Sequence, residues 1–253
     1  MSAITTDCTQ ILYIPFHASI AIPKNGAVEK LINRALEIPE KTRGFKRLYW
    51  GKRLEDQILQ IHIGAFPPSL TPLPPPMLKL TPPPVRDNLL NSKEWLDLPS
   101  YQTFLTILTP LTMGRPTIQH AYLAPYSPSC RALSHGSPIT GTATYLSPRR
   151  EAWDAAWARW QSIVAEVPGF MGIAGGPVVE DVDGARTSFV VFVGWESVEM
   201  HEKFHRSEGF RGVKHVLEEP VRGYVGYGHV CFRNENEEMG KGGSGVGERG
   251  VKL

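Results

Sequence analysis

The chain has 253 residues, of which 42% are hydrophobic, and a formal net charge of +2. This length and hydrophobic content suffice for one large core or two modest ones. The near-balance of charge argues against a nucleic-acid partner, because nucleic-acid binders usually carry a basic stripe. Three cysteines without a CxxC pair argue against a disulfide framework or a structural zinc site. With no signal-peptide pattern and no membrane-length apolar run, we expect a cytoplasmic protein without a membrane partner.

Three segments lack the patterns of regular structure. Residues 66–90 hold nine prolines, a density that precludes a helix interior or a central strand and predicts an extended insertion. Residues 234–253 are rich in Gly, Glu and Lys and predict a disordered tail. Residues 125–138 are rich in Pro and Ser and predict a linker.

An internal repeat becomes visible once these segments are set aside. The matching positions of the two halves are, in order, Gly44-Phe45 with Gly169-Phe170, Gly51 with Gly176, Glu55-Asp56 with Glu180-Asp181, Gly64 with Gly194, Gly114 with Gly223, and His120 with His229. Five additional residues in the second half predict a longer hairpin turn at Asp183-Gly184. The repeat predicts a first unit over 1–124 and a second unit over 139–233.

The first unit opens with a predicted strand over 10–17. A helix follows, capped by Asn25 and ended by Pro39, with one apolar face made by Val28, Leu31, Ile32, Ala35 and Leu36. The remaining predicted elements are strands over 45–51 and 57–64, a helix over 92–108 broken near Pro99, and a closing strand over 117–123.

The second unit repeats that order. It begins with a strand over 139–146 and a helix capped by Ser147, with Pro148 at its first position. The apolar stripe of this helix is Trp153, Trp157, Trp160, Val164 and Val167, and the helix ends at Pro168-Gly169. The remaining predicted elements are strands over 172–178 and 188–195, a helix capped by Ser197, a helical piece over 210–217, and a last strand over 224–232.

Each unit thus reads as βαββαβ, which is a ferredoxin-like arrangement. Its antiparallel sheet has helices on one face only, so the bare face must be covered by something else. The other copy is the nearest cover. The predicted fold class is α+β, with two ferredoxin-like units forming a pseudo-dimeric α/β barrel, and the fused chain could pair further as a homodimer.

The run Val193–Phe204, together with Pro168-Gly169-Phe170, resembles antibiotic-biosynthesis-monooxygenase-like domains of the dimeric α/β barrel superfamily. The resemblance covers about residues 140–232 and is fainter in the first unit, where Ala65 stands in the place of Trp195. The tandem, single-chain arrangement with extra loops resembles that of family members from filamentous fungi. The resemblance implies a ligand between the sheet and the helices of one unit.

The resemblance leaves the reaction open, because a fold alone does not choose the chemistry. Related proteins include cofactor-independent oxygenases of phenols and anthrones, haem-degrading enzymes, polyketide cyclases, dehydratases and proteins without known chemistry. Nucleotide-binding motifs are absent from the sequence. His201 and His205 could present two imidazoles on one helix face, but no third ligand is evident, and we expect no metal.

Histidines on strands are the main catalytic candidates. His120 and His229 occupy matching positions, and alternation places Tyr122 and Tyr227 on the same strand faces. Histidine can exchange a proton at neutral pH, and tyrosine can hydrogen-bond an oxyanion. The alternative is that both histidines lie between the units, bonded to backbone.

His62 shares a strand face with Gln60, and either lines a wet pocket or is satisfied by neighbours, since an unpaired buried polar group costs about 1–3 kcal/mol. Tyr13 and His17 are further candidates for substrate contact. Trp153 and Trp157 belong to the core or form an aromatic wall against a planar ligand. Trp195 is a further candidate contact. The first unit, which holds most of these polar residues, is the favoured reactive one.

The main hypothesis for function is a cofactor-independent enzyme that cyclises, dehydrates or isomerises a polyketide- or terpenoid-like small molecule by acid–base chemistry. One alternative is a cofactor-free monooxygenase of an electron-rich phenol or anthrone. Another is a binding or scaffold protein without chemistry, docking through its proline-rich insertion. Haem ligation by a pocket histidine such as His120 is a minor further possibility.

Overall fold

The computed structural model describes residues 8–23, 26–42, 45, 47–64, 86–124, 132–133 and 137–233, with side chains left out for 86–91. Most of the predicted insertion and linker, the predicted tail, and the predicted cap Asn25 lie outside these residues. The predicted limits of the two units stay a prediction.

The first unit contains the elements β1 (Cys8–Pro15), α1 (Ala27–Glu40), β2 (Arg47–Lys52), β3 (Ile58–Gly64), α2 (Arg86–Asp97), α3 (Pro99–Leu108), a short 3-10 turn η1 (Thr109–Leu111) and β4 (Thr117–Tyr122). The second unit contains β5 (Ile139–Leu146), α4 (Arg150–Ala165), β6 (Phe170–Val178), β7 (Ser188–Trp195), α5 (Val198–Arg206), α6 (Glu208–Val213), α7 (His215–Glu218) and β8 (Gly223–Val230).

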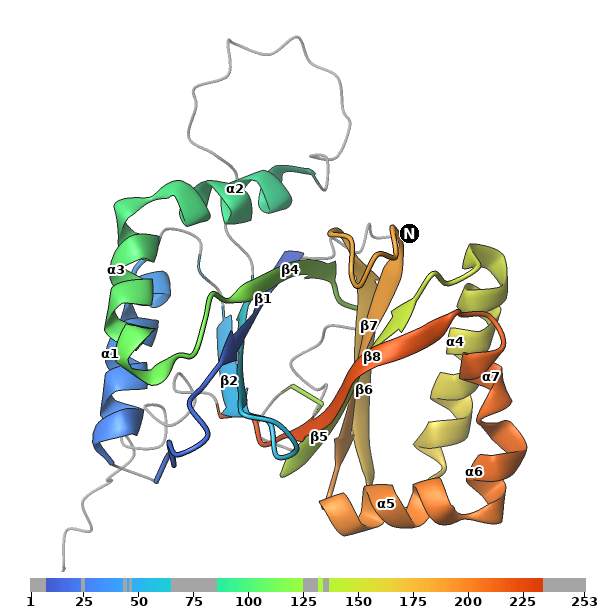
Figure 1. Ribbon diagram of the computed structural model, residues 1–253. Helices are drawn as coiled ribbons and strands as arrows, with labels where there is room; N and C mark the ends of the chain where they lie inside the picture. Colours follow the sequence, from blue (N-terminus) through green and yellow to red (C-terminus); the bar gives the residue numbers. More distant parts are fainter. Residues whose placement is uncertain are drawn as a thin grey trace, which may run out of the picture.

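The eight strands form one antiparallel sheet in the order β2-β3-β1-β4-β6-β7-β5-β8. The units meet where β4 pairs with β6 at Ala121 and Val178. The sheet closes at its other end, where Arg53 after β2 pairs with Val230 of β8. These two joints are equivalent under the internal repeat. The predicted fold class, two ferredoxin-like units closing a pseudo-dimeric α/β barrel, is therefore confirmed (Figure 1).

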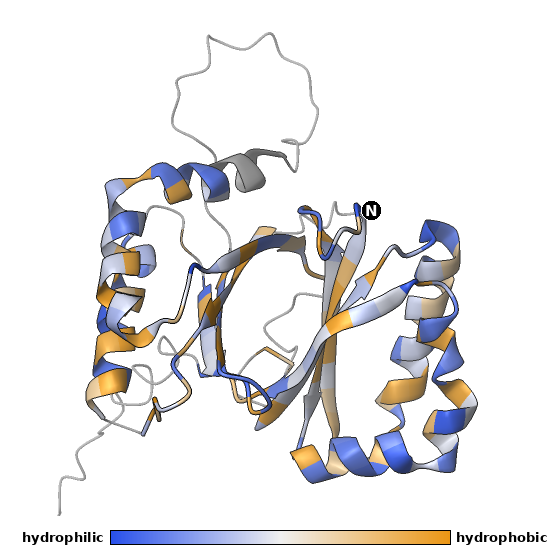
Figure 2. Cartoon of the chain, in the orientation of Figure 1, coloured by the Kyte–Doolittle hydropathy of each residue, from blue (hydrophilic) through white to orange (hydrophobic). Residues whose placement is uncertain are grey.

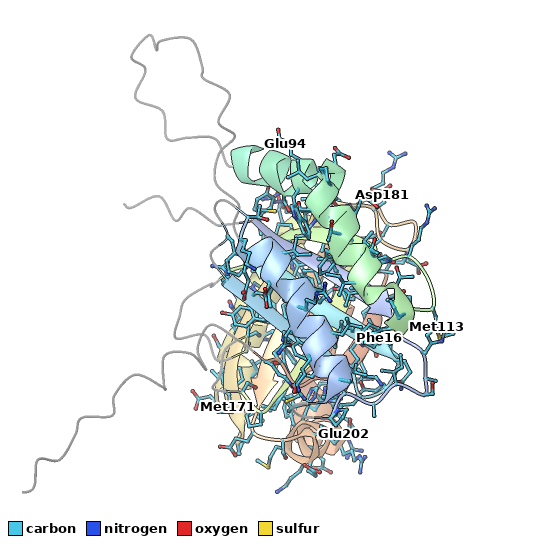
Figure 3. All side chains as sticks on the ribbon, turned by 90° about the vertical axis from the view of Figure 1, so that its left-hand side faces the viewer. Phe16, Glu94, Met113, Met171, Asp181 and Glu202 are labelled. Carbon is cyan, nitrogen blue, oxygen red and sulfur yellow. The ribbon has the colours of Figure 1, made fainter. Side chains whose placement is uncertain are left out.

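The helices form two outer layers on opposite sides of the strands, with α1–α3 on one side and α4–α7 on the other (Figure 1). Hydrophobic residues follow the strands and the inward sides of the helices (Figure 2). Viewed onto the first unit, α1 and α3 cover the strands, while Glu94 and Met113 lie at the margin (Figure 3). Three buried clusters result: one under each helical layer and one inside the barrel.

Several local predictions are corrected by the structure. α1 begins at Ala27 with Gly26 as its N-cap. α4 is capped by Arg149, not Ser147, whose backbone φ of 50° makes the turn from β5 instead. Helix α2 begins inside the predicted extended insertion, which is possible because the proline run ends at Pro84. The cap at Ser197 is confirmed, since its Oγ accepts the N–H of Met200.

The predicted hairpin turn at Asp183-Gly184 is confirmed. Both residues have left-handed backbone conformations, with φ of 48° and 71°. Val182 and Ala185 pair across the turn. This geometry matches the two-residue turn that joins antiparallel strands with the usual twist, so the five additional residues of the second unit extend a hairpin without disturbing the barrel.

His62 faces the interior of the barrel. It pairs across the sheet with Ile11 of β1, and its ring lies 4.9 Å from Phe192 and 4.8 Å from Phe232, measured between ring centroids. Neither ring nitrogen has a hydrogen-bond partner among the described residues. Burial lowers the pKa of His62 to about 3, so the ring is neutral in the folded protein at physiological pH.

We expect His62→Phe to raise the free energy of unfolding by about 1–3 kcal/mol, because it removes two buried nitrogens without partners. Phe192 occupies the matching position of the second unit. The pKa of His62 is lower in the folded state, so its neutral form is favoured and stability is lost as pH falls below about 6.5. The loss approaches about 1.4 kcal/mol per pH unit until pH approaches the folded pKa.

Urea unfolding at pH 7 and pH 5 measures both effects, and the variant should show a shallower loss between the two values. His17→Gln is the matched control, because His17 is exposed. An unchanged slope in His62→Phe would contradict the burial of a neutral His62.

Candidate functional site

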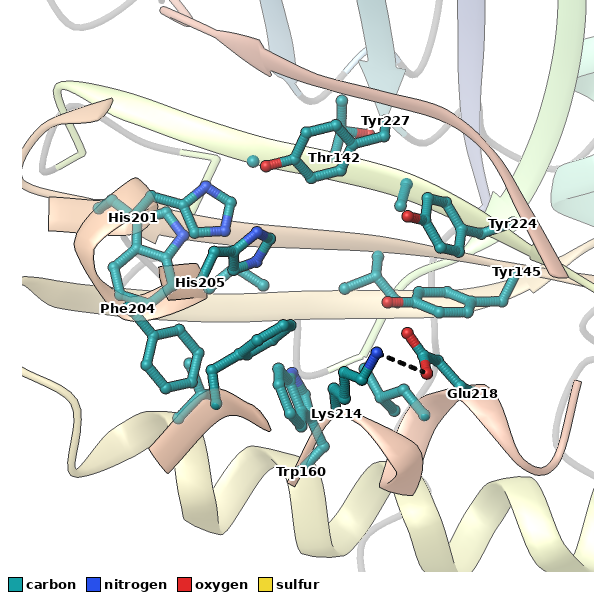
Figure 4. Close-up of a pocket in the computed structure, with 18 residues that line it drawn as sticks. Thr142, Tyr145, Trp160, His201, Phe204, His205, Lys214, Glu218, Tyr224 and Tyr227 are labelled. Carbon is teal, nitrogen blue, oxygen red and sulfur yellow. Dashed lines mark ion pairs between the residues drawn. The ribbon is translucent and has the colours of Figure 1, made fainter. Parts of the chain in front are cut away.

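A pocket lies between the sheet and the helices of the second unit and opens partly to solvent (Figure 4). It encloses about 90 Å³. Strands β5, β7 and β8 form its floor, and helices α4–α7 form its other walls. Its lining includes an apolar set made by Trp160, Val164, Val191, Val193, Trp195, Phe204, Phe210 and Leu217. The preference for the first unit as the reactive one is therefore not supported by this pocket.

A β-bulge brings two tyrosines of β8 to the same pocket. The pairing of β5 with β8 shifts register between Thr142 and Thr144, and Gly226 adopts a φ of 65° there. In a regular strand, Tyr224 and Tyr227 would face opposite sides, since they are three residues apart. With the bulge, both line the pocket.

Neighbouring residues fix the position of the His201 ring at one end of the pocket. Ser197 caps the N-terminus of α5, one turn before His201. The ring of His201 stacks on Trp195, with centroids 4.7 Å apart and an interplanar angle of 17°. Gly141 of β5 lies beneath it, and a Cβ there would come within 2.9 Å of Cε1 of His201. His205 packs edge-on against the same ring, with centroids 4.3 Å apart.

A hydrogen-bond chain connects this end of the pocket to the first unit. Glu55, in the turn between β2 and β3, accepts the backbone N–H of His229 at 2.7 Å and bonds Nδ1 of the same residue at 2.5 Å. Nε2 of His229 lies 2.7 Å from Nδ1 of His201. Nε2 of His201 has no bonded partner among the described residues, and the ring lines the pocket.

The charges along this chain follow from its environment. Burial raises the pKa of Glu55, but the hydrogen bonds from the His229 backbone and ring outweigh it, so the net pKa is lower and Glu55 is a carboxylate. Burial, together with nearby His205 and His229, lowers the pKa of His201 to about 2. His201 is therefore neutral. Burial also raises the pKa of Tyr227, so its hydroxyl stays protonated and can donate.

The first unit contains the same arrangement with a different ending. Glu180 accepts the backbone N–H of His120 at 2.6 Å and bonds its Nδ1 at 2.7 Å. Nε2 of His120 then meets Oγ of Ser92 at 3.0 Å and Nε2 of Gln10 at 3.4 Å. Ser92 precedes His120 by 28 residues, the same separation as between His201 and His229.

No histidine therefore stands in the first unit where the second has His201. Gln10 occupies the strand position that Gly141 has in the second unit, since each pairs with the corresponding histidine. Trp95, Tyr101 and Phe104 pack against one another between sheet and helices, all buried.

The predicted site residues fall into separate places. The second-unit pocket brings together His229, Tyr227 and Trp195. In the first unit, His120 and Tyr122 lie beside Glu180, which comes from the second unit. His62, Gln60 and Tyr13 face the barrel interior, and burial raises the pKa of Tyr13 to about 12. His17 is exposed. Trp153 and Trp157 pack on Phe189 in the core of the second unit.

The alternative interpretation placed both His120 and His229 between the units, bonded to backbone. The structure confirms their place and corrects their bonding partners. Both lie at the joints between units, but their rings bond side chains: a carboxylate at each Nδ1, and Ser92 or His201 at Nε2. The catalytic and binding roles predicted for the residues above stay predictions.

Sequence reasoning missed the roles of four residues in the two hydrogen-bond chains and the pocket. It weighed His201 and His205 only as metal ligands, and it used Glu55 and Glu180 only as markers of the repeat. A charged residue recurring in both units was the available signal, since two copies that keep a carboxylate and a histidine at matching positions invite a pairing between them. Among the residues that the structure describes, no three His, Cys, Asp or Glu side chains are arranged to hold a metal ion.

None of the helices that the structure describes is long and apolar enough to cross a membrane. A scan of the sequence against models of protein families found no match. A search of curated proteins found no similar sequence.

Solved structures with the same fold do exist. An anthrone oxidase-like protein superposes with a TM-score of 0.59 at 14% identity, covering 92% of this chain and 95% of that one. A candidate monooxygenase from Fusobacterium nucleatum gives 0.56 at 9% identity, covering 93% and 96%. A candidate chlorite dismutase gives 0.51 at 9% identity, covering 93% and 99%. These similarities establish the fold, and the closer resemblance to antibiotic-biosynthesis-monooxygenase-like domains stays a prediction.

We expect Gly141→Ala to weaken binding of a planar aromatic probe, 2-naphthol, by about tenfold. The new methyl group would displace the ring of His201 and narrow the pocket. Quenching of tryptophan fluorescence measures the binding, because Trp160 and Trp195 line the pocket. Gly212→Ala is the control, since a Cβ there meets nothing within 4 Å. Equal affinities for the two variants would place the probe outside this pocket.

Proposed function

We propose that this protein is an enzyme that removes a proton from a small planar aromatic molecule bound in the second-unit pocket, with His201 as the base. The observation that carries the proposal is geometric: Nδ1 of His201 bonds His229, His229 bonds the carboxylate of Glu55, and Nε2 of His201 faces the pocket without a partner among the described residues. The carboxylate at the start of this chain stabilises the imidazolium that forms when His201 takes a proton, which offsets the effect of burial. A positioned imidazole lone pair is a common device for general-base catalysis.

The aromatic lining of the pocket favours a flat aromatic substrate, and because the pocket encloses only about 90 Å³, a substrate of polyketide type would extend through its open side. Aromatic rings from Trp160, Trp195, Phe204 and Phe210 make much of its wall, and such rings bind planar molecules by stacking and edge contacts. The far end is polar, with Tyr145, Tyr224 and the ion pair of Lys214 and Glu218, whose charged atoms lie 3.9 Å apart (Figure 4). A substrate with oxygen atoms at both ends fits this distribution.

The proposed step uses two side chains of the His201 end. Nε2 of His201 takes a proton from a phenolic O–H or an activated C–H of the substrate. The electron pair left behind is delocalised onto an oxygen of the substrate, and the hydroxyl of Tyr227 donates to that oxygen. The hydroxyl is buried and has no partner among the described residues, so it is available to the substrate. Cyclisation, dehydration or isomerisation can follow from such an anion.

Oxygenation is the second candidate, favoured by the apolar lining near His201. At a CH2 carbon, the same anion can reduce dioxygen: both C–H bonds break, one oxygen atom enters as a ketone, and the other leaves with the two hydrogens as water, so the substrate supplies all four electrons. The resemblance in fold to proteins described as a monooxygenase and as anthrone oxidase-like supports this candidate. Neither route calls for a cofactor. A binding protein without chemistry is the remaining alternative.

We expect His201→Gln to lower kcat by about a hundredfold or more with KM little changed, because the proton acceptor is lost while the walls remain. A hydroxyanthrone serves as substrate, followed by absorbance and by oxygen consumption. Uptake of one dioxygen per product identifies the oxygenase, and product without uptake identifies the acid–base route.

His215→Gln is the matched control, because His215 is exposed outside this pocket. Its rate should equal that of the unaltered protein. A His201→Gln variant with near-normal turnover would contradict the role of His201, and the absence of any turnover across a panel of hydroxylated aromatics would favour the binding protein.

A further inference from the structure

The two Glu–His pairs at the joints between the units occupy equivalent positions, but their hydrogen bonds continue to different groups. The pair of Glu180 and His120 ends at the hydroxyl of Ser92 and the amide of Gln10. The pair of Glu55 and His229 continues to His201, which lines the pocket. Only one of two similar joints therefore connects to the candidate site.

We propose that Glu55 of the first unit is a positioning residue that sets the tautomer of His229 and, through it, the tautomer of His201 in the second unit. Its kinetic consequence rests on the proposed function of His201, but the proton positions themselves do not. The base of the second unit is then complete only with a carboxylate from the first.

The proton positions follow from the donors and acceptors along the chain. A carboxylate only accepts, so Glu55 takes the backbone N–H of His229 on Oε2 and its Nδ1–H on Oε1. In the proposed arrangement, Nε2 of His229 then carries a lone pair and accepts the Nδ1–H of His201. With its proton on Nδ1, His201 keeps its lone pair on Nε2, on the pocket side. The low pKa of Glu55 agrees with a carboxylate at the start of the chain.

Glutamine at position 55 would move the ring protons of His229 and His201 from Nδ1 to Nε2. The backbone N–H of His229 is fixed as a donor, so the single amide oxygen must face it. The amide NH₂ then faces Nδ1 of His229, which must become the acceptor. His229 carries its proton on Nε2 and donates to Nδ1 of His201, which leaves the proton of His201 on Nε2. The pocket then meets an N–H in place of a lone pair.

Glu180 supplies the matched control within the same chain. Glutamine at position 180 reverses the tautomer of His120 by the same argument. The effect ends there, because the hydroxyl of Ser92 can donate or accept with equal ease, and Gln10 offers an amide of either kind. Both substitutions remove the same two hydrogen bonds from equivalent joints. Glu180→Gln also removes the 3.9 Å ion pair with half-exposed Lys93, which adds little because exposed ion pairs are weak, so the costs in stability should be similar.

The test compares the full-length protein with Glu55→Gln and Glu180→Gln after selective ¹⁵N labelling of histidine rings. Protonated and unprotonated ring nitrogens have well-separated ¹⁵N chemical shifts, and His→Gln variants at 120, 201 and 229 assign them. In the unaltered protein, His201 and His229 should both be protonated on Nδ1. Glu55→Gln should move both protons to Nε2, whereas Glu180→Gln should move only that of His120.

Kinetics with the hydroxyanthrone provide the second readout. Glu55→Gln should lower kcat by tenfold to a hundredfold with KM unchanged, Glu55→Asp should restore part of the rate, and Glu180→Gln should leave it unchanged. Unchanged tautomers in Glu55→Gln would overturn the proposal. Equal rate losses in both Gln variants, with equal falls in melting temperature, would also overturn it, because joint stability would then explain the loss. Reversed tautomers with a normal rate would instead overturn His201 as the base.

Discussion

The closure of the barrel is the constraint on which the remaining structure depends. The four strands of each unit have helices on one face only, so their other face must be buried against the other unit. Strand pairing at the joints is short, with Ala121 and Val178 at one and Arg53 and Val230 at the other. Beside each pairing, a glutamate binds both the backbone and the ring of a histidine from the other unit. These bonds add directional contacts where the backbone ladder is thin.

The same closure lets two similar units divide their tasks. At equivalent places, Gln10 fills space in the first unit while Gly141 leaves space in the second, and Ser92 stands where His201 does. The backbone geometry is shared, so the difference lies in side-chain volume and in the ability of the last group to accept a proton. Under the proposed function, the first unit serves as a scaffold that also supplies one carboxylate to the second.

The interior of the barrel contains buried polar side chains that lower its stability. His62 and Gln60 face it from β3, and neither side chain has a hydrogen-bond partner for its nitrogen atoms among the described residues. Phe192, at the position in the second unit that matches His62, shows the apolar solution to the same problem. Burial of unpartnered polar groups lowers stability, so His62 stabilises the barrel core less than Phe192 does at the matching position.

The sequence by itself predicted the order of elements and the closed barrel, because strand alternation, helical stripes and turn residues such as Asp183-Gly184 act over a few positions. It placed β5 and β7 at their observed bounds, but it misplaced two helix caps, where short-range alternatives differ little in energy. The site was decided by the tertiary structure alone. Glu55 and His229 are 174 residues apart, and whether His201 carries a free lone pair depends on three groups that only the closed barrel brings together. The pocket likewise depends on the combined volumes of side chains from strands and helices that are distant along the chain. Local sequence patterns do not predict these volumes.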